Sequence, residues 1–281
     1  MSVDHRLSPK YPFPAAIIDV FLTYLELLYP GDQALHAPVD PETIVIAGES
    51  SGAAICLSLI QLIFSLPRDK ENRCPVVPFH GRLVNVPMPC GVALLCPEAD
   101  RSNSMPSWLG NAHKDWIPNR PPPHKPTFPS DHLWPSVPPR QDVYCHSSAF
   151  LNPISNPVMA QNWRGCPSVW IAYGEERCLD SGKIVATRML QSGVSVLWSE
   201  YRSMPHIFPV VMKSTTQAKL CMRDWADACL ALAKGNKVES AGVMILPPGD
   251  SQNPIDMRDL DILDHSEVVA LVQKAVETMP V

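Results

Sequence analysis

Apolar residues along this chain recur in two patterns, one typical of buried strands and the other typical of amphipathic helices. Short continuous runs of aliphatic residues predict strands over residues 43–47, 91–96, 168–173 and 194–201. Apolar residues spaced three and four positions apart predict helices over residues 15–29, 51–64, 183–192 and 215–232. Residues 2–4 have the pattern of a strand stub. Because strands and helices alternate, we expect an α/β fold with a mostly parallel central sheet that helices cover on both faces.

Two stretches interrupt this alternation. Residues 118–139 are rich in proline and predict an irregular loop, which belongs to a lid-like excursion over residues 101–145. Near the C-terminus, Asp264 and Glu267 have the spacing of a capping box before an apolar stripe. We therefore expect a core over residues 1–234 and a C-terminal tail over residues 235–281 with one short helix.

The composition excludes several classes of protein. Hydrophobic residues make up 46% of the chain and charged residues 18%, which is unlike a disordered protein. A net charge of −5 gives no basic excess for binding nucleic acid. No signal peptide and no apolar run long enough to cross a membrane is present, and the nine scattered cysteines include no CxxC pair. We expect a cytoplasmic protein with free thiols, no metal site, and no nucleic-acid or membrane partner.

Candidate chemistry begins where the predicted strand 43–47 ends. Residues 48–52 read Gly48-Glu49-Ser50-Ser51-Gly52, a GxSxG pattern between a strand and a helix. Small residues on both sides allow the sharp turn that exposes the serine hydroxyl, and the N–H groups at the helix start favour negative charge. GxSxG alone is a weak signal, because a tight turn can use glycine only for packing. The strand–turn–helix context favours a nucleophile.

A nucleophilic serine needs a base, and the base needs an acid that orients it. Loops that follow the carboxyl ends of parallel strands supply both candidates. Glu176 and Asp180 follow the predicted strand that ends at Tyr173, and His206 follows the strand that ends at Tyr201. The order serine, acid, histidine along the chain is that of α/β hydrolases.

Over residues 2–232 the chain resembles the hormone-sensitive-lipase group of α/β hydrolases, particularly its fungal esterase-like branch. Residues 4–9 (DHRLSP) and 12–16 (PFPAA) resemble the group's D-Y-R-L-[AS]-P…P-[FY]-P-A-A segment, residues 48–52 its G-[DE]-S-A-G elbow, and residues 204–208 (MPHIF) its M-P-H-x-F. Residues 96–115 and 174–180 resemble its S-P-W-x-D…S…N…D stretch and its acid loop.

The resemblance implies roles for individual residues and an activity. Ser50 would be the nucleophile, His206 the general base and Glu176 the acid, with Asp180 as the alternative acid. The backbone N–H of Ser51 would be one oxyanion donor. The implied activity is two-step hydrolysis of a carboxylic ester of a small molecule without a cofactor, in fungal secondary metabolism by family association.

One motif of the group, H-G-G-G, is absent from residues 1–281. In the group it supplies oxyanion donors from a strand beside the nucleophile strand. The only HG pair, His80-Gly81, follows Ser50 and is not expected to replace it. We therefore expect the α/β-hydrolase fold without its N-terminal strands, including the oxyanion-loop strand, and an open edge beside residues 44–47.

Three explanations for this departure remain open: a longer protein that continues upstream of Met1, a truncated paralogue, or a partner chain that completes the sheet. The alternative function is that of a weakly active or non-catalytic hydrolase-fold remnant, or of a ligand-binding module. The sequence fixes neither the acyl and alcohol specificity nor the oligomeric state.

Overall fold

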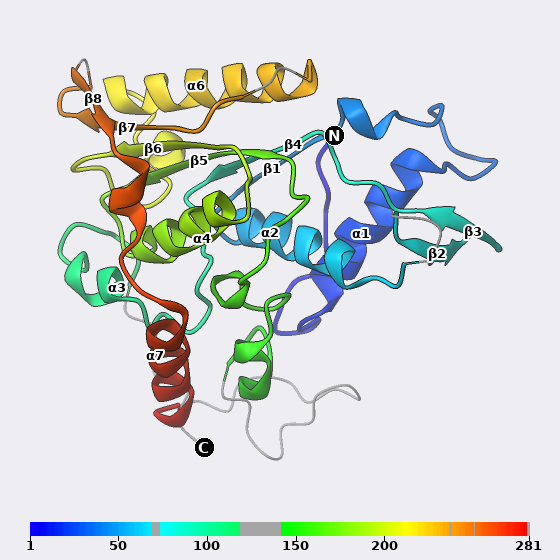
Figure 1. The fold of residues 1–281 in the computed structure, drawn as a ribbon, viewed down its shortest axis with the longest axis horizontal. Helices are drawn as coiled ribbons and strands as arrows, with labels where there is room; N and C mark the ends of the chain where they lie inside the picture. The colour runs from blue at the N-terminus through cyan, green and yellow to red at the C-terminus, as the bar shows by residue number, and fades with distance from the viewer. Residues whose placement is uncertain (69–73, 119–141, 236–237, 250, 280–281) are drawn as a thin grey trace.

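A six-stranded sheet lies at the centre of the molecule, with strand order β1–β4–β5–β6–β7–β8 (Figure 1). The computed structural model describes residues 1–68, 74–118, 142–235, 238–249 and 251–279. The strands are β1 (Val45–Glu49), β4 (Gly91–Leu95), β5 (Ser168–Gly174), β6 (Val196–Tyr201), β7 (Ala241–Leu246) and β8 (Ser251–Ile255). All neighbours pair in parallel except β7 and β8, which confirms the predicted α/β fold with a mostly parallel sheet.

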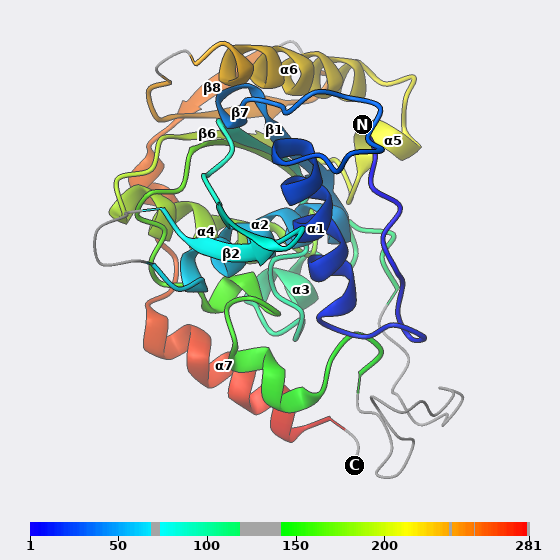
Figure 2. The same ribbon diagram turned by 90° about the vertical axis from the view of Figure 1, so that its right-hand side faces the viewer.

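Helices cover both faces of this sheet. Helix α6 (Thr216–Ala233) lies on one face, and α2 (Ser50–Ser65) and α4 (Leu179–Gln191) lie on the other (Figure 1). Figure 2 shows α6 and α7 (His265–Glu277) at opposite ends of the molecule. The remaining elements are α1 (Ala15–Leu28), the hairpin of β2 (Val76–Phe79) and β3 (Arg82–Asn85), the short helices α3 (Pro106–Gly110) and α5 (Phe208–Val211), and four 3₁₀ turns at Pro41–Thr43, Ser147–Leu151, Pro157–Met159 and Met257–Leu260.

The central strands are apolar throughout because both of their faces are buried. In β4, Val92 and Leu94 pack in the core against α2 and α4, whereas Ala93 and Leu95 pack in the core beneath α6. All four side chains are fully buried. Successive side chains of a strand point to opposite faces of a sheet, so a two-sided core selects a continuous apolar run.

The structure differs from the sequence-based expectations at both ends of the chain. Residues 2–4 are not a strand: they have no regular structure, and no described residue pairs with the outer edge of β1. The expected C-terminal tail contains two strands, β7 and β8, that extend the sheet, besides the predicted helix α7 with its capping box of Asp264 and Glu267. Most of the proline-rich loop predicted over residues 118–139 lies outside the described residues.

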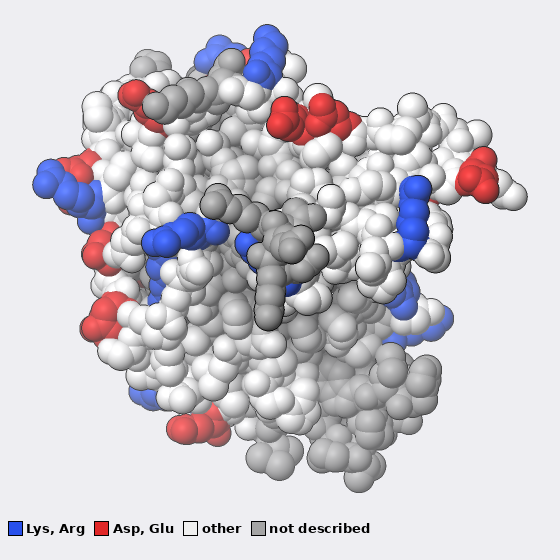
Figure 3. Space-filling model, turned by 45° about the vertical axis from the view of Figure 1, so that its right-hand side comes forward, with Lys and Arg blue, Asp and Glu red and all other residues white. Residues whose placement is uncertain are grey.

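Charged side chains are dispersed over the surface. On the face shown in Figure 3, the described Lys, Arg, Asp and Glu residues are scattered over a mostly uncharged surface. Among the described helices, none has the length and apolar character needed to cross a membrane. No disulfide joins any of the nine cysteines, all of which lie within the described ranges.

Candidate active site

Ser50 lies at a sharp turn between β1 and α2. Its φ angle is 51°, a left-handed conformation that is uncommon for a residue with a side chain. At Gly48, a Cβ atom would lie 2.6 Å from the backbone carbon of Gly52, so only glycine fits there. Gly52 itself has open space where its Cβ would be, so the prediction that both glycines are needed sterically holds for Gly48 alone. The turn leaves the Ser50 side chain partly exposed.

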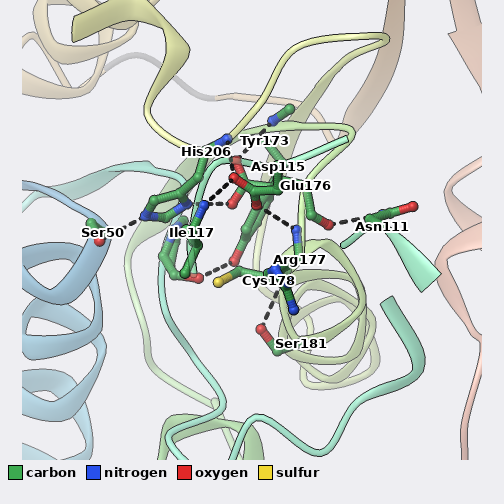
Figure 4. A network of polar contacts seen from close by, with 12 residues as sticks. Ser50, Asn111, Asp115, Ile117, Tyr173, Glu176, Arg177, Cys178, Ser181 and His206 are labelled. Atoms are coloured by element: carbon green, nitrogen blue, oxygen red, sulfur yellow. Dashed lines mark hydrogen bonds and ion pairs between the residues drawn. The ribbon is translucent and has the colours of Figure 1, made fainter. Parts of the chain in front are cut away.

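Three side chains from three separate segments form a continuous hydrogen-bonded row (Figure 4). The Oγ atom of Ser50 lies 2.8 Å from Nε2 of His206. On the other side of the ring, Nδ1 of His206 lies 2.7 Å from Oε1 of Glu176. The side chain of Glu176 is fully buried and that of His206 is 5% exposed. This geometry allows the imidazole to take a proton from Ser50 while the carboxylate orients the ring and stabilises its charged form.

The structure separates the two candidate acids. Glu176 follows β5 in a loop, and its second oxygen, Oε2, accepts a hydrogen bond from the Gly174 N–H at 3.3 Å. Asp180 lies in the first turn of α4, where its carboxylate accepts the Ser107 N–H at 2.8 Å. Glu176 therefore contacts His206, whereas Asp180 forms a hydrogen bond that links the start of α4 to the start of α3.

The environment of His206 favours its protonated form. Burial alone would lower the pKa of His206, but the negative charge and hydrogen bond of Glu176 outweigh it. The charges of Asp115 and Glu98 act in the same direction, so the pKa lies above its ordinary value. A raised pKa suits a base that must hold the serine proton during a reaction.

Residues 111–116, the segment after α3, form hydrogen bonds with both the loop that carries Glu176 and the loop that carries His206. The carboxylate of Asp115 accepts the Arg177 N–H at 2.9 Å and the His206 N–H at 3.3 Å. Asn111 donates from its amide to the Glu176 carbonyl at 2.8 Å, and Trp116 donates from its indole N–H to the His206 carbonyl at 2.8 Å. Asn111 and Asp115 belong to the motif of residues 96–115, but no local pattern in the sequence reveals these contacts.

Two further ionisable groups lie beside the triad. The Cys96 thiol, which is fully buried, lies with Glu176 and His206 in a group whose donor atoms are within 4.8 Å of one another. Burial, followed by the charge and hydrogen bond of Glu176, raises the pKa of Cys96, so the thiol stays protonated. Any metal ion at this group would compete with the Glu176–His206 hydrogen bond.

Glu49 precedes Ser50, and its Oε2 atom is buried with no hydrogen-bond partner among the described residues. Burial raises the pKa of Glu49; the charge of His206 acts against this shift, and the charge of Glu176 adds to it. A carboxyl group in this environment is more easily protonated than an exposed one.

One backbone donor for an oxyanion is available from the turn. Ser51 follows Ser50 in the first turn of α2, where backbone N–H groups have no partner within the helix. His80 and Gly81 lie far along the chain in the turn between β2 and β3, and His80 pairs with Glu26 of α1 at 2.8 Å. His80 therefore pairs with α1 and not with the triad, as expected for an HG pair that does not replace H-G-G-G.

Comparisons of sequence identify a family and named relatives. A profile of the family described as "alpha/beta hydrolase fold" matches residues 1–210. Lipase 2 of Moraxella sp. (strain TA144) is 30% identical over 118 residues, which are 38% of this chain and 26% of that protein. Carboxylesterase NlhH of Mycobacterium tuberculosis (strain CDC 1551 / Oshkosh) is 39% identical over 62 residues, which are 22% of this chain and 18% of that protein.

Comparisons of structure give the same fold. A crystal structure of EstE5 soaked with p-nitrophenyl butyrate superposes with a TM-score of 0.60 at 22% identity, over 82% of this chain and 65% of EstE5. A hormone-sensitive lipase from a metagenome library superposes with a TM-score of 0.59 at 25% identity, over 83% of this chain and 65% of that lipase. The chain thus spans less than two thirds of the length of these proteins.

Proposed function

This chain belongs to the α/β hydrolase fold family, and we propose that it is an esterase of the hormone-sensitive-lipase group that hydrolyses carboxylic esters of small molecules. One observation carries the proposal: Ser50, His206 and Glu176 form a hydrogen-bonded row at a strained turn in a fold whose relatives are named as esterases and lipases. The roles are Ser50 as nucleophile, His206 as general base and acid, and Glu176 as the orienting acid.

The proposed reaction has two steps. Ser50 Oγ attacks the ester carbonyl carbon while its proton passes to Nε2 of His206, and the carbonyl oxygen becomes an oxyanion that the Ser51 N–H stabilises. The C–O bond to the alcohol then breaks as His206 returns the proton to the alcohol oxygen. Water next attacks the acyl carbon on Ser50 while its proton passes to His206. The bond from the acyl carbon to Ser50 Oγ then breaks as His206 returns that proton to Oγ, and the carboxylic acid leaves.

Labelling and turnover test the proposal together. We expect a fluorophosphonate probe to label wild-type protein on Ser50, and a short p-nitrophenyl ester to be hydrolysed, with both signals lost in Ser50→Ala. Ser65→Ala removes a hydroxyl at the other end of the same helix and is the matched control, since within the described part of the chain the Ser65 hydroxyl donates to the Leu62 carbonyl of its own helix. Labelling that persists in Ser50→Ala, or no labelling of folded wild-type protein, would refute the proposal.

A second candidate function is ligand binding with weak or no turnover, since the described residues at the turn offer one oxyanion donor, the Ser51 N–H. Removing one oxyanion donor costs about two to three orders of magnitude in turnover in a protease. Under this candidate, folded protein would bind an ester in a calorimeter without releasing its alcohol.

The finer assignments extend the proposal. The fungal esterase-like branch rests on the motif residues of the resemblance, and a substrate from secondary metabolism rests on family association. A location in the cytoplasm rests on nine cysteines without a disulfide.

A further inference from the structure

An exposed tryptophan lies beside the buried triad. The side chain of Trp116 is 52% exposed, although tryptophan is among the side chains that gain most from burial. Its indole N–H donates to the His206 carbonyl, so a hydrogen bond rather than packing fixes its orientation. A large exposed aromatic side chain that is held in place next to catalytic groups is a feature of binding surfaces.

The position of this ring relative to His206 is fixed from two sides. The centroids of the indole and imidazole rings are 6.3 Å apart, with an angle of 48° between the planes. The neighbouring residue, Asp115, accepts the backbone N–H groups of His206 and Arg177. The indole therefore belongs to the same rigid group as the imidazole.

The proposed chemistry determines which part of a substrate lies near His206. Nε2 must pass its proton to the oxygen of the departing alcohol, so this oxygen has to lie within hydrogen-bond distance of Nε2. The carbonyl oxygen lies instead toward the Ser51 N–H. Groups attached to the alcohol oxygen are consequently on the imidazole side of the scissile bond, within reach of the Trp116 ring.

We propose that Trp116 forms a wall of the alcohol subsite and makes the enzyme prefer esters whose alcohol part is aromatic or extended and apolar. The inference rests on the proposed esterase function and adds a substrate class to it. An aromatic alcohol can stack on or pack against the indole, whereas a methyl or ethyl group is too small to cover it. We expect Trp116 to act on the alcohol part of the ester and not on the acyl chain.

Two series of unactivated esters test the assignment with the full chain. Ethyl, butyl and benzyl acetate vary the alcohol, and ethyl acetate, butyrate and hexanoate vary the acyl group, with kcat/KM followed by acid release. In Trp116→Ala we expect the benzyl-to-ethyl ratio of kcat/KM to fall about tenfold, which corresponds to the loss of one aromatic contact. The dependence of kcat/KM on acyl-chain length should stay the same as in wild type.

Two other variants separate substrate contact from structural effects. Trp116→Phe keeps an aromatic ring but loses the hydrogen bond to the His206 carbonyl, and we expect it to retain most of the benzyl preference. Leu109→Ala removes a 76% exposed apolar side chain of the same segment and should alter neither series.

The outcomes distinguish this inference from the proposed function. Ser50-dependent hydrolysis by wild type together with an unchanged benzyl-to-ethyl ratio in Trp116→Ala would overturn the alcohol subsite alone. A uniform loss over all esters, or a changed acyl slope, would also overturn it. No Ser50-dependent hydrolysis of any ester by folded wild type would overturn the esterase function and the subsite with it.

Discussion

The exchange Glu176→Gln is the sharpest test of the proposed triad. It replaces a buried carboxylate with a neutral amide of nearly the same shape, so packing changes little. In the wild type, the carboxylate oxygen lies 2.7 Å from Nδ1 of His206, and neither side chain is more than 5% exposed. The exchange therefore removes the charge that stabilises the imidazolium, in a place where solvent screens little.

The size of the loss follows from the Coulomb energy of this pair. At an effective dielectric constant of about 20 and charge centres about 4 Å apart, the attraction is about 4 kcal/mol. The imidazolium is only partly formed in the transition state, so about 3 kcal/mol of stabilisation is lost from that state. At about 1.4 kcal/mol per factor of ten, kcat should fall roughly a hundredfold or more.

The assay compares Glu176→Gln with Asp180→Asn. Steady-state hydrolysis of a short p-nitrophenyl ester, corrected for active protein by fluorophosphonate titration, gives kcat for each variant. Asp180→Asn keeps an oxygen that can accept the Ser107 N–H, so its kcat should stay within a few-fold of wild type while the free energy of unfolding falls by about 1 kcal/mol. If Glu176→Gln kept kcat within tenfold and Asp180→Asn lost two orders of magnitude, Asp180 would be the acid and the reasoning would be wrong.

Three further predictions concern pH, the turn and the connecting segment. His206 must be neutral to accept the Ser50 proton and its pKa is raised, so kcat/KM should fall as pH drops through that raised pKa. Glu176→Gln removes the largest of the effects that raise this pKa, while burial still lowers it, so a pH–rate profile should show the acid limb at lower pH. Gly48→Ala, whose Cβ would lie 2.6 Å from backbone, should lower the free energy of unfolding by about 3 kcal/mol. Gly52→Ala, where the Cβ has open space, should change it by less than about 1 kcal/mol. Thermal unfolding measures both, and equal losses would refute the steric argument. Asp115→Ala should lower kcat about tenfold or more with little change in KM, because both loops lose an acceptor that holds them; a Ser50-labelling rate equal to that of wild type would contradict this.

The sequence predicts a strand or turn correctly where its local residue pattern is compatible with only one structure. The strand at residues 91–96 was recognisable because both of its faces are buried, and the elbow because GxSxG stands between a strand and a helix. Strand β8, with the sequence SQNPI, was missed because it is an exposed edge strand without apolar alternation. Residues 2–4 were misassigned as a strand because a strand needs a neighbour to pair with, and pairing is a property of the fold.

The choice between acids shows the same limit at the level of the site. Glu176 and Asp180 both follow the same strand, and their sequence neighbourhood does not say which carboxylate meets the imidazole. The decision depends on where α4 begins: Asp180 is in its first turn and is used by Ser107, whereas Glu176 is still in the loop. The role of Asp115 could not be predicted either, because its partners Arg177 and His206 come close to it only in the folded protein.

These contacts imply that the acid and the base move as a unit. Asn111 holds the loop of Glu176, and Asp115 holds the backbone of both Arg177 and His206. Ser50 belongs to a different unit, since its position is set by β1, α2 and the steric fit of Gly48. A displacement of the segment after α3 would thus preserve the 2.7 Å contact between Glu176 and His206 and change the distance from Nε2 to Ser50 Oγ. The hydrogen bond between Ser50 and His206 is therefore one contact through which that segment can affect catalysis.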